Sequence, residues 1–187
     1  LALLLLCLVA LNASGLFSFD CDLMKSLAGL LAVFIAVDAF FIGCECLTMA
    51  YPGAGESVAL AEMTTGSTAP FFWFEIIGGL LIPFLLLVFS KNRGKTGVVV
   101  FASVMVVLGV CCKRLWLLFT SFVHPNIEGA NGITLGTQAA QGDPSAMWSL
   151  LGTYAPTGVE VTIALGTISL GALAFVVLSH LFLKAND

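Results

Sequence analysis

The sequence has few charged residues and only two histidines. Charged side chains make up 10% of the 187 residues and hydrophobic ones 59%, with a mean hydropathy of +1.08. Soluble domains carry about 25% charged residues, so this composition excludes an ordinary soluble protein and indicates an integral membrane protein. The chain also has no basic patch suited to nucleic acid, and we expect its surroundings to be the lipid bilayer.

Residues that hold metals or haem are also sparse. The six cysteines form no Cys-x-x-Cys motif, and neighbouring ones are too close in sequence for a metal ion or an iron–sulfur cluster. A haem between helices needs histidines inside the bilayer, whereas His124 opens a loop and His180 lies near the opposite membrane face. The sequence therefore predicts neither a haem nor an iron–sulfur cluster in this chain.

Long apolar runs, by contrast, fill most of the chain. About 20 apolar residues in a helix cross a bilayer. We predict an all-α integral membrane protein, a single bundle of about five transmembrane helices at residues 1–17, 27–49, 70–89, 97–123 and 157–182. Because the chain starts with Leu1 inside an apolar run and without a basic segment before it, we expect a fragment of a longer protein.

The segments between the spans are predicted as turns and loops. We expect a short turn over residues 19–25, a Gly/Ser/Thr-rich loop after Tyr51, a tight basic turn over 90–95 and a long loop from His124 to Ala155. With alternating crossings, all Lys and Arg residues outside the spans fall on one side: Lys25, Lys91, Arg93, Lys95 and Lys184. Since basic loops stay on the cytoplasmic side, we predict that this side is cytoplasmic.

Ionisable residues inside the predicted spans are the main functional signal. Lys113 and Arg114 stand side by side in the fourth span, and each costs roughly 2.5–3.5 kcal/mol in a bilayer unless it is compensated. Acidic residues that can compensate them lie in three other spans: Asp38, Glu45, Glu75 and Glu160. Charges within membrane helices usually face the bundle interior and pair with one another.

Depth along the helices predicts which charges meet. Counting about 1.5 Å per residue places five of them in the outer part of the membrane: Lys113, Arg114, Glu45, Glu75 and Glu160. Asp38 is expected nearer the midplane, on nearly the same helix face as Glu45. We predict an outer charge cluster with Tyr154 and His124 at its rim, and a proton path along Asp38 and Glu45. The alternative is that these residues only lock the helices together.

Some residues near these charges have structural explanations. Thr157 and Glu160 have the spacing of a capping box at the start of the fifth span. Gly78 and Gly79 are predicted as close-packing positions in the third span, and Pro83 is expected to kink or loosen the same helix.

Four short motifs, one in each of the last four spans, occur in a particular order. They are Val37-Asp38-Ala39-Phe40 with Glu45, Phe72-Trp73-Phe74-Glu75 with Gly78-Gly79 and Pro83, the buried Arg114, and the segment Tyr154–Glu160. Together they resemble the NrfD/PsrC family of membrane subunits, which includes the HybB-type hydrogenase subunits. The resemblance covers nearly the whole chain and corresponds to the C-terminal half of such proteins, which makes this chain the second helical bundle of a larger subunit.

This resemblance implies an all-helical anchor, without a redox centre of its own, in the inner membrane of a bacterium or archaeon. Such subunits bind menaquinone or ubiquinone beside an iron–sulfur, ferredoxin-like partner, which exchanges electrons with a molybdopterin-type catalytic subunit or a multihaem cytochrome c. They belong to polysulfide and nitrite reductases, hydrogenases, menaquinone reductases and alternative complex III. In some members, the half that this chain resembles is proposed to conduct protons, with the quinone head group in the other half.

The favoured hypothesis is therefore a quinone-interacting membrane subunit of a respiratory oxidoreductase. In it, Lys113 and Arg114 hold acidic partners or stabilise charge near a quinone, while Asp38 and Glu45 line the proton path. Two alternatives stay open. One is a secondary transporter or ion-conducting bundle, which a helix interrupted at Pro83 and a deep Asp38 favour. The other is a purely structural membrane anchor.

Overall fold

A computed structural model of the chain describes all residues except 16, 19, 52–56, 67, 124–155 and 185–187. The described residues form helices and no strand. In chain order these are α1 (Ala2–Ala13), α2 (Cys21–Met49), α3 (Ser57–Thr65), α4 (Ala69–Phe74), the π-helix η1 (Glu75–Leu81), α5 (Ile82–Val88), α6 (Ser90–Arg93), α7 (Thr96–Val123) and α8 (Gly158–Lys184).

Four helical segments are long and apolar enough to cross a membrane. They are Cys21–Met49, Ala69–Val88, Thr96–Phe119 and Gly158–Leu181, and α1 is a shorter apolar helix. The predicted all-α integral membrane protein is confirmed in these residues, and its apolar runs coincide with the helices. The predicted long loop from His124 to Ala155 lies outside the described residues.

The predicted short turn over residues 19–25 is wrong, because α2 already begins at Cys21. Asp20 precedes the helix in an extended conformation, and Asp22 lies in the first turn, where a carboxylate interacts favourably with the helix dipole. Lys25 Nζ lies 2.9 Å from Asp22 Oδ1, an i,i+3 pair that supports a helix. Polar residues here extend α2 beyond the apolar run instead of ending it.

The predicted loop after Tyr51 is also partly wrong, because it contains α3. Leu60 and Met63, three residues apart, pack on the side of α3 that faces the bundle, and Met63 is buried against Phe72. Trp73 Nε1 also donates a hydrogen bond to the carbonyl of Thr64 at 3.1 Å. Tertiary packing of these few apolar residues overrides the weak helix propensity of a Ser/Thr-rich segment.

The third crossing is a continuous helix that changes its winding. The turns from Glu75 to Leu81 are π-helical, and the α-helix resumes at Ile82. Pro83 follows at once, and since proline has no backbone N–H it cannot bond to the Gly79 carbonyl as in an α-helix. The sequence predicted a loosened helix at Pro83, and the structure has the wider π winding in the turns just before it.

η1 and α7 approach each other closely at a pair of glycines. A Cβ added to Gly79 would lie 2.7 Å from the Cα of Gly109, and one added to Gly109 would lie 2.5 Å from the Cα of Gly79. Neither distance leaves room for a side chain. The predicted close packing at Gly79 is confirmed, with Gly109 as its partner.

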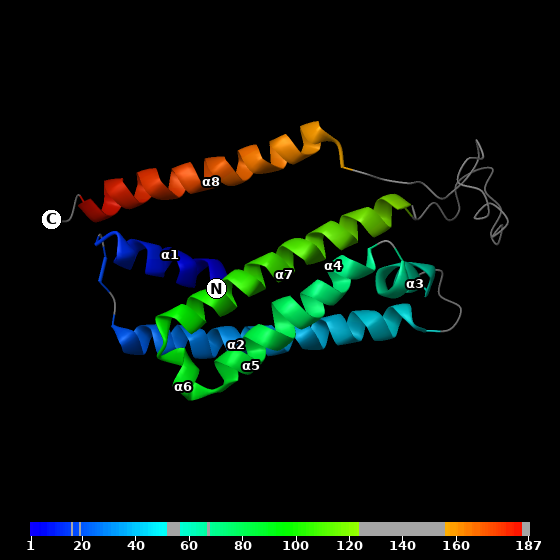
Figure 1. Cartoon of the computed structure of the whole chain (residues 1–187), viewed down its shortest axis with the longest axis horizontal. Helices are drawn as coiled ribbons and strands as arrows, with labels where there is room; N and C mark the ends of the chain where they lie inside the picture. The colour runs from blue at the N-terminus through cyan, green and yellow to red at the C-terminus, as the bar shows by residue number, and fades with distance from the viewer. Residues whose placement is uncertain (16, 19, 52–56, 67, 124–155, 185–187) are drawn as a thin grey trace.

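Figure 1 shows α2, α7 and the α4–η1–α5 crossing packed together, with α1 beside the first half of α7. The core between them contains Leu5 of α1, Leu31 of α2, Leu87 of α5 and Val99 of α7. α8 stands apart in the same view, and none of its membrane-crossing window is buried. For α8 the expected single bundle therefore stays a prediction.

Basic residues of the connecting segments gather at one end of the helices. Figure 1 places α6, the start of α2 and the C-terminal end of α8 at the same end. Lys25 belongs to the start of α2, and Lys91 and Arg93 belong to α6. The alternating crossings on which the orientation rests are thus present, and the cytoplasmic location of this end stays a prediction.

Candidate functional site

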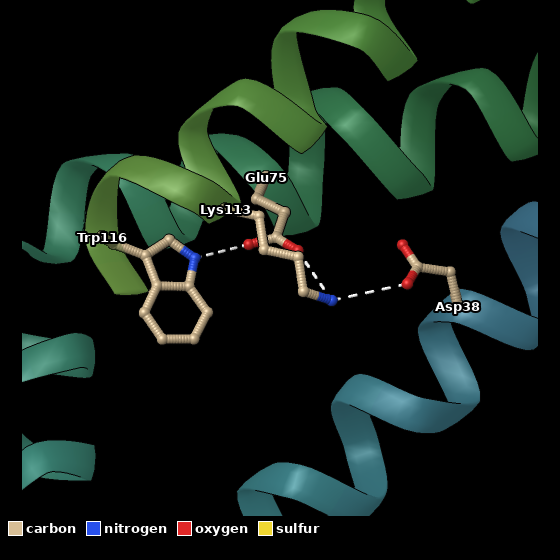
Figure 2. Close-up of polar contacts among 4 residues, drawn as sticks. All are labelled: Asp38, Glu75, Lys113 and Trp116. Atoms are coloured by element: carbon tan, nitrogen blue, oxygen red, sulfur yellow. Dashed lines mark hydrogen bonds and ion pairs between the residues drawn. The ribbon is translucent and has the colours of Figure 1, made fainter. Parts of the chain in front are cut away.

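Lys113 joins two carboxylates that are far apart in the sequence (Figure 2). Its Nζ lies 3.4 Å from Asp38 Oδ1 and 3.7 Å from Glu75 Oε1. The three residues come from α7, α2 and η1, so one ammonium links three of the packed helices. We call Asp38, Glu75 and Lys113 the charge cluster. Its members are three of the ionisable residues that the sequence singled out.

Glu75 is the most enclosed member of the charge cluster, with only 2% of its surface exposed. Its Oε2 accepts a hydrogen bond from Trp116 Nε1 at 2.6 Å. Its Oε1 is buried and accepts no hydrogen bond from any described residue, so the Lys113 ammonium is its polar neighbour. A buried carboxylate needs a paired charge and hydrogen bonds to be tolerated, and Lys113 and Trp116 supply them.

Aromatic packing holds the Trp116 donor in place. The rings of Phe72 and Trp116 meet edge to face with centroids 5.9 Å apart, a favoured aromatic geometry. Met63 of α3 completes this small core, in which Trp116 is 1% exposed. The unexpected helix α3 therefore belongs to the support of the site.

A cavity of about 380 Å³ adjoins the charge cluster, and both Asp38 and Glu75 line it. The rest of its wall is apolar and comes from α1, α2, η1 and α7, including Leu31 and the glycine pair Gly79 and Gly109. Glu75 thus stands between the aromatic core on one side and this cavity on the other. A carboxylate at the wall of an apolar cavity is placed to exchange a proton with a donor or acceptor in that cavity.

The exposure of the three side chains falls from one carboxylate to the other. The side chain of Asp38 is 41% exposed, that of Lys113 is 20% exposed and that of Glu75 is 3% exposed. Asp38 is therefore the most exposed member of the cluster and Glu75 the most enclosed, although both line the cavity. If both carboxylates are ionised, the net charge of the cluster is −1, and a single added proton makes it neutral.

The depth of Asp38 in a membrane stays a prediction, but its expected separation from the level of Lys113 is wrong, because Asp38 Oδ1 lies 3.4 Å from Lys113 Nζ. The reason is the early start of α2 at Cys21. Asp38 is then about 25 Å along α2, and Lys113 is about 25 Å along α7 from Thr96. Asp38 belongs with Lys113 and Glu75, while Glu45 lies seven residues further along α2.

Arg114 does not join the charge cluster. Its side chain is exposed, and no ion pair links it to any residue that the structure describes. Adjacent residues of an α-helix point about 100° apart, so only one of Lys113 and Arg114 can face Asp38 and Glu75. The sequence identified the pair, and the structure selects Lys113.

The other expected members lie elsewhere. Glu45 is half-buried and forms no ion pair or hydrogen bond within the described part of the chain. Glu160 accepts a hydrogen bond from the backbone N–H of Thr157 at 2.7 Å, and its own N–H donates to Thr157 Oγ1 at 3.4 Å. The capping box is thus confirmed, on the helix that stands apart. His124 and Tyr154 lie outside the described residues.

Trp116 is the site residue that sequence reasoning missed. It follows Lys113 by three residues, so both side chains lie on one face of α7. An indole N–H that is buried in a membrane helix needs an acceptor, and Glu75 is the acceptor here. The three-residue spacing from Lys113 and the need of a buried indole N–H for an acceptor could have identified Trp116 from the sequence.

Replacing Trp116 with phenylalanine tests this hydrogen bond. The variant keeps an aromatic ring against Phe72 but leaves Glu75 Oε2 without its donor. Hydrogen bonds to charged groups contribute about 1.5–3 kcal/mol, and we expect a loss of stability in that range by thermal unfolding in detergent. Trp73→Phe is the matched control, because the Trp73 indole bonds to an exposed carbonyl and its loss should cost less. Equal losses for both variants would contradict the assigned role.

Comparison with known sequences now gives the family. Residues 1–126 match the family described as "Polysulphide reductase, NrfD". The chain belongs to the NrfD family. This confirms the resemblance read from the motifs, and with the apolar helices it makes the chain a multi-pass membrane protein.

Two NrfD-type relatives extend over most of the chain. A protein of Halobacterium salinarum, named as a membrane subunit of dimethyl sulfoxide reductase, is 33% identical over 92% of this chain and 40% of its own length. A protein of Mesobacillus selenatarsenatis, named as a subunit of selenate reductase, is 30% identical over 82% of this chain and 34% of its own length. The chain thus spans well under half of these relatives. No solved structure matches it significantly.

Proposed function

We propose that this NrfD-family chain is part of the quinone-linked membrane subunit of a respiratory oxidoreductase, and that its charge cluster moves the protons that accompany quinone chemistry. The observation that carries the proposal is the placement of Lys113 between Asp38 and the buried Glu75, beside a cavity. Ionisable residues within membrane helices mark ion and proton pathways. The two relatives are named as reductase subunits, which supports the respiratory setting.

The polar groups at the cavity fit proton transfer better than they fit a quinone head group. A quinone carbonyl accepts hydrogen bonds, whereas the charged groups that line this cavity are the carboxylates Asp38 and Glu75. We therefore place the quinone head group in the part of the subunit that this chain does not include. Bound there, the quinone supplies the redox step and takes up or releases protons.

The residues of this chain then transfer protons and take no part in the redox step. Asp38, on the more exposed side, takes up a proton, and Glu75 exchanges one at the cavity wall. Lys113 contacts both carboxylates, so its ammonium stabilises whichever one is ionised while the other holds the proton. Trp116 holds Glu75 Oε2 and leaves Oε1 towards Lys113 as the exchanging oxygen.

Quinol-dependent electron transfer in an Asp38→Asn variant tests the proposal. Asparagine keeps the size of Asp38 but cannot ionise, and positioned proton-transfer groups contribute roughly 10²–10⁴-fold to rates. We expect turnover to fall at least about tenfold in the purified complex. Asp22→Asn, which removes a carboxylate from the exposed start of α2, should leave turnover unchanged. Wild-type turnover of a normally assembled Asp38→Asn complex would refute the proton role.

The oxidoreductase setting has its own test. We expect the intact subunit to co-purify with an iron–sulfur protein and a catalytic subunit, which mass spectrometry of the purified complex identifies. A protein that purifies without redox partners and supports ion-dependent uptake would instead be a transporter.

A structural role of the charge cluster is the second candidate, because Lys113 ties α2 and η1 to α7. In that case Asp38→Asn and Glu75→Gln would lower stability while turnover of the remaining folded complex stays at the wild-type level. Measuring thermal unfolding and turnover on the same preparations separates the two roles.

A further inference from the structure

A groove of about 400 Å³ runs along the surface of the bundle where α2 meets α5 and α6. Both sides of the groove are mostly apolar, and the apolar lining residues are Gly29, Ala32, Val33, Ala36, Val37 and Phe40 of α2 with Phe84 and Val88 of α5. Along α2 the lining extends from Gly29 to Phe40, which corresponds to about 16 Å of helix. The groove is therefore open to the surface and apolar over most of its length.

The groove has one charged lining residue, Arg93, at the end where α6 lies. The Arg93 guanidinium donates through Nε to the carbonyl of Leu87 and through Nη2 to that of Val88, at 3.1 Å for the latter. Its Nη1 lies 2.9 Å from the position that a Cβ on Gly29 would take. Among the described residues no acceptor for Nη1 is found, so its N–H groups are available at the groove.

Three lysines belong to the same end of the helices as Arg93 (Figure 1). Lys91 and Lys95 flank Arg93 in sequence and are exposed. Lys25 Cε lies 3.5 Å from the position of a Cβ on Gly94, and its ammonium is paired with Asp22. This end is the one where the basic residues of the chain gather, so it carries an excess of positive charge at the predicted membrane surface.

We propose that the groove binds one anionic phospholipid, with an acyl chain along the α2–α5 lining and the phosphate against Arg93 Nη1 and the neighbouring lysines. This occupant fits both ends of the groove, since an apolar lining on membrane-crossing helices leads to the Arg93 guanidinium at the basic end. Basic pockets between membrane helices are a known means of binding anionic head groups. A zwitterionic lipid offers the same phosphate, but its own positively charged group would lie close to the lysine ammonium groups and be repelled by them.

Native mass spectrometry of the intact protein tests the groove with two probes, dioleoylphosphatidylglycerol and dioleoylphosphatidylcholine. We expect one phosphatidylglycerol to bind at least about fivefold more tightly than phosphatidylcholine. Ala36→Phe fills part of the groove and should abolish this preference. Ala39→Phe is the matched control, because Ala39 is an exposed alanine of the same helix and does not line the groove.

The head-group end has a separate test that leaves the Arg93 hydrogen bonds intact. Lys91→Gln and Lys95→Gln should each weaken phosphatidylglycerol binding by roughly fivefold, with little effect on phosphatidylcholine. Lys184→Gln removes the same charge from the end of α8 and should have no effect. Equal binding of the two lipids to the wild type, or equal effects of Ala36→Phe and Ala39→Phe, would overturn the site. So would a polypeptide that co-purifies with the wild type and is lost on Ala36→Phe while phosphatidylglycerol binding persists.

Discussion

Replacing Lys113 with methionine is expected to lower the free energy of unfolding by about 3–5 kcal/mol, because it leaves a buried carboxylate without its cation. Glu75 is 2% exposed, and Lys113 is the cation within salt-bridge distance of it in the described structure. Asp38 loses the same partner. Thermal unfolding of the purified protein in detergent measures the loss.

Two further variants give this experiment its specificity. Arg114→Met removes the same charge from an exposed neighbour with no described ion pair, and exposed substitutions usually change stability by no more than about 0.5 kcal/mol. Adding Glu75→Gln to Lys113→Met neutralises the stranded carboxylate and should recover much of the lost stability, which appears as a coupling in a double-mutant cycle. If Lys113→Met and Arg114→Met are equally destabilising, the assignment of the buried ion pair to Lys113 is wrong.

Replacing Gly79 with alanine is expected to cost about 1–3 kcal/mol, and replacing it with leucine to prevent correct packing of η1 on α7. The added Cβ would lie 2.7 Å from the Cα of Gly109, a backbone atom that cannot rotate away. Moving the two helices apart would also shift Glu75, which lies one turn before Gly79. Expression level, elution as a single species and thermal unfolding together measure the effect.

Gly43→Ala is the matched control for this prediction. A Cβ on Gly43 of α2 meets no atom within 4 Å, and alanine favours a helix over glycine by about 1 kcal/mol. We therefore expect Gly43→Ala to be neutral or stabilising. A Gly79→Ala protein as stable as Gly43→Ala would show that the helices do not meet closely at this point.

The sequence predicted the membrane helices well because the requirement behind them is simple. Crossing a bilayer takes about 20 apolar residues whose backbone groups bond within the helix, and the apolar runs are visible directly. The same logic grouped Lys113 and Glu75 with Arg114, Glu45 and Glu160 in one expected cluster, since uncompensated charges are costly in a bilayer. Opposite charges in different spans therefore had to be considered together.

Other features depended on geometry that the sequence does not specify. Whether Lys113 or Arg114 faces the carboxylates is decided by the rotation of α7, which the packing of Gly109 on Gly79 helps to set. The level of Asp38 depended on where α2 begins, and polar residues at its start concealed the first turns. The π winding that begins at Glu75 has no sequence signature beyond the nearby Pro83.

Proton movement coupled to turnover shows whether the charge cluster carries protons for quinone chemistry. The purified complex is reconstituted in vesicles, and pH-sensitive dyes record protons inside and outside during quinol-driven electron transfer. For Glu75→Gln we predict normal assembly, strongly slowed turnover and loss of the proton signal that the wild type gives. A Glu75→Gln complex with wild-type turnover and an unchanged number of protons per quinol would show that the charge cluster does not carry these protons.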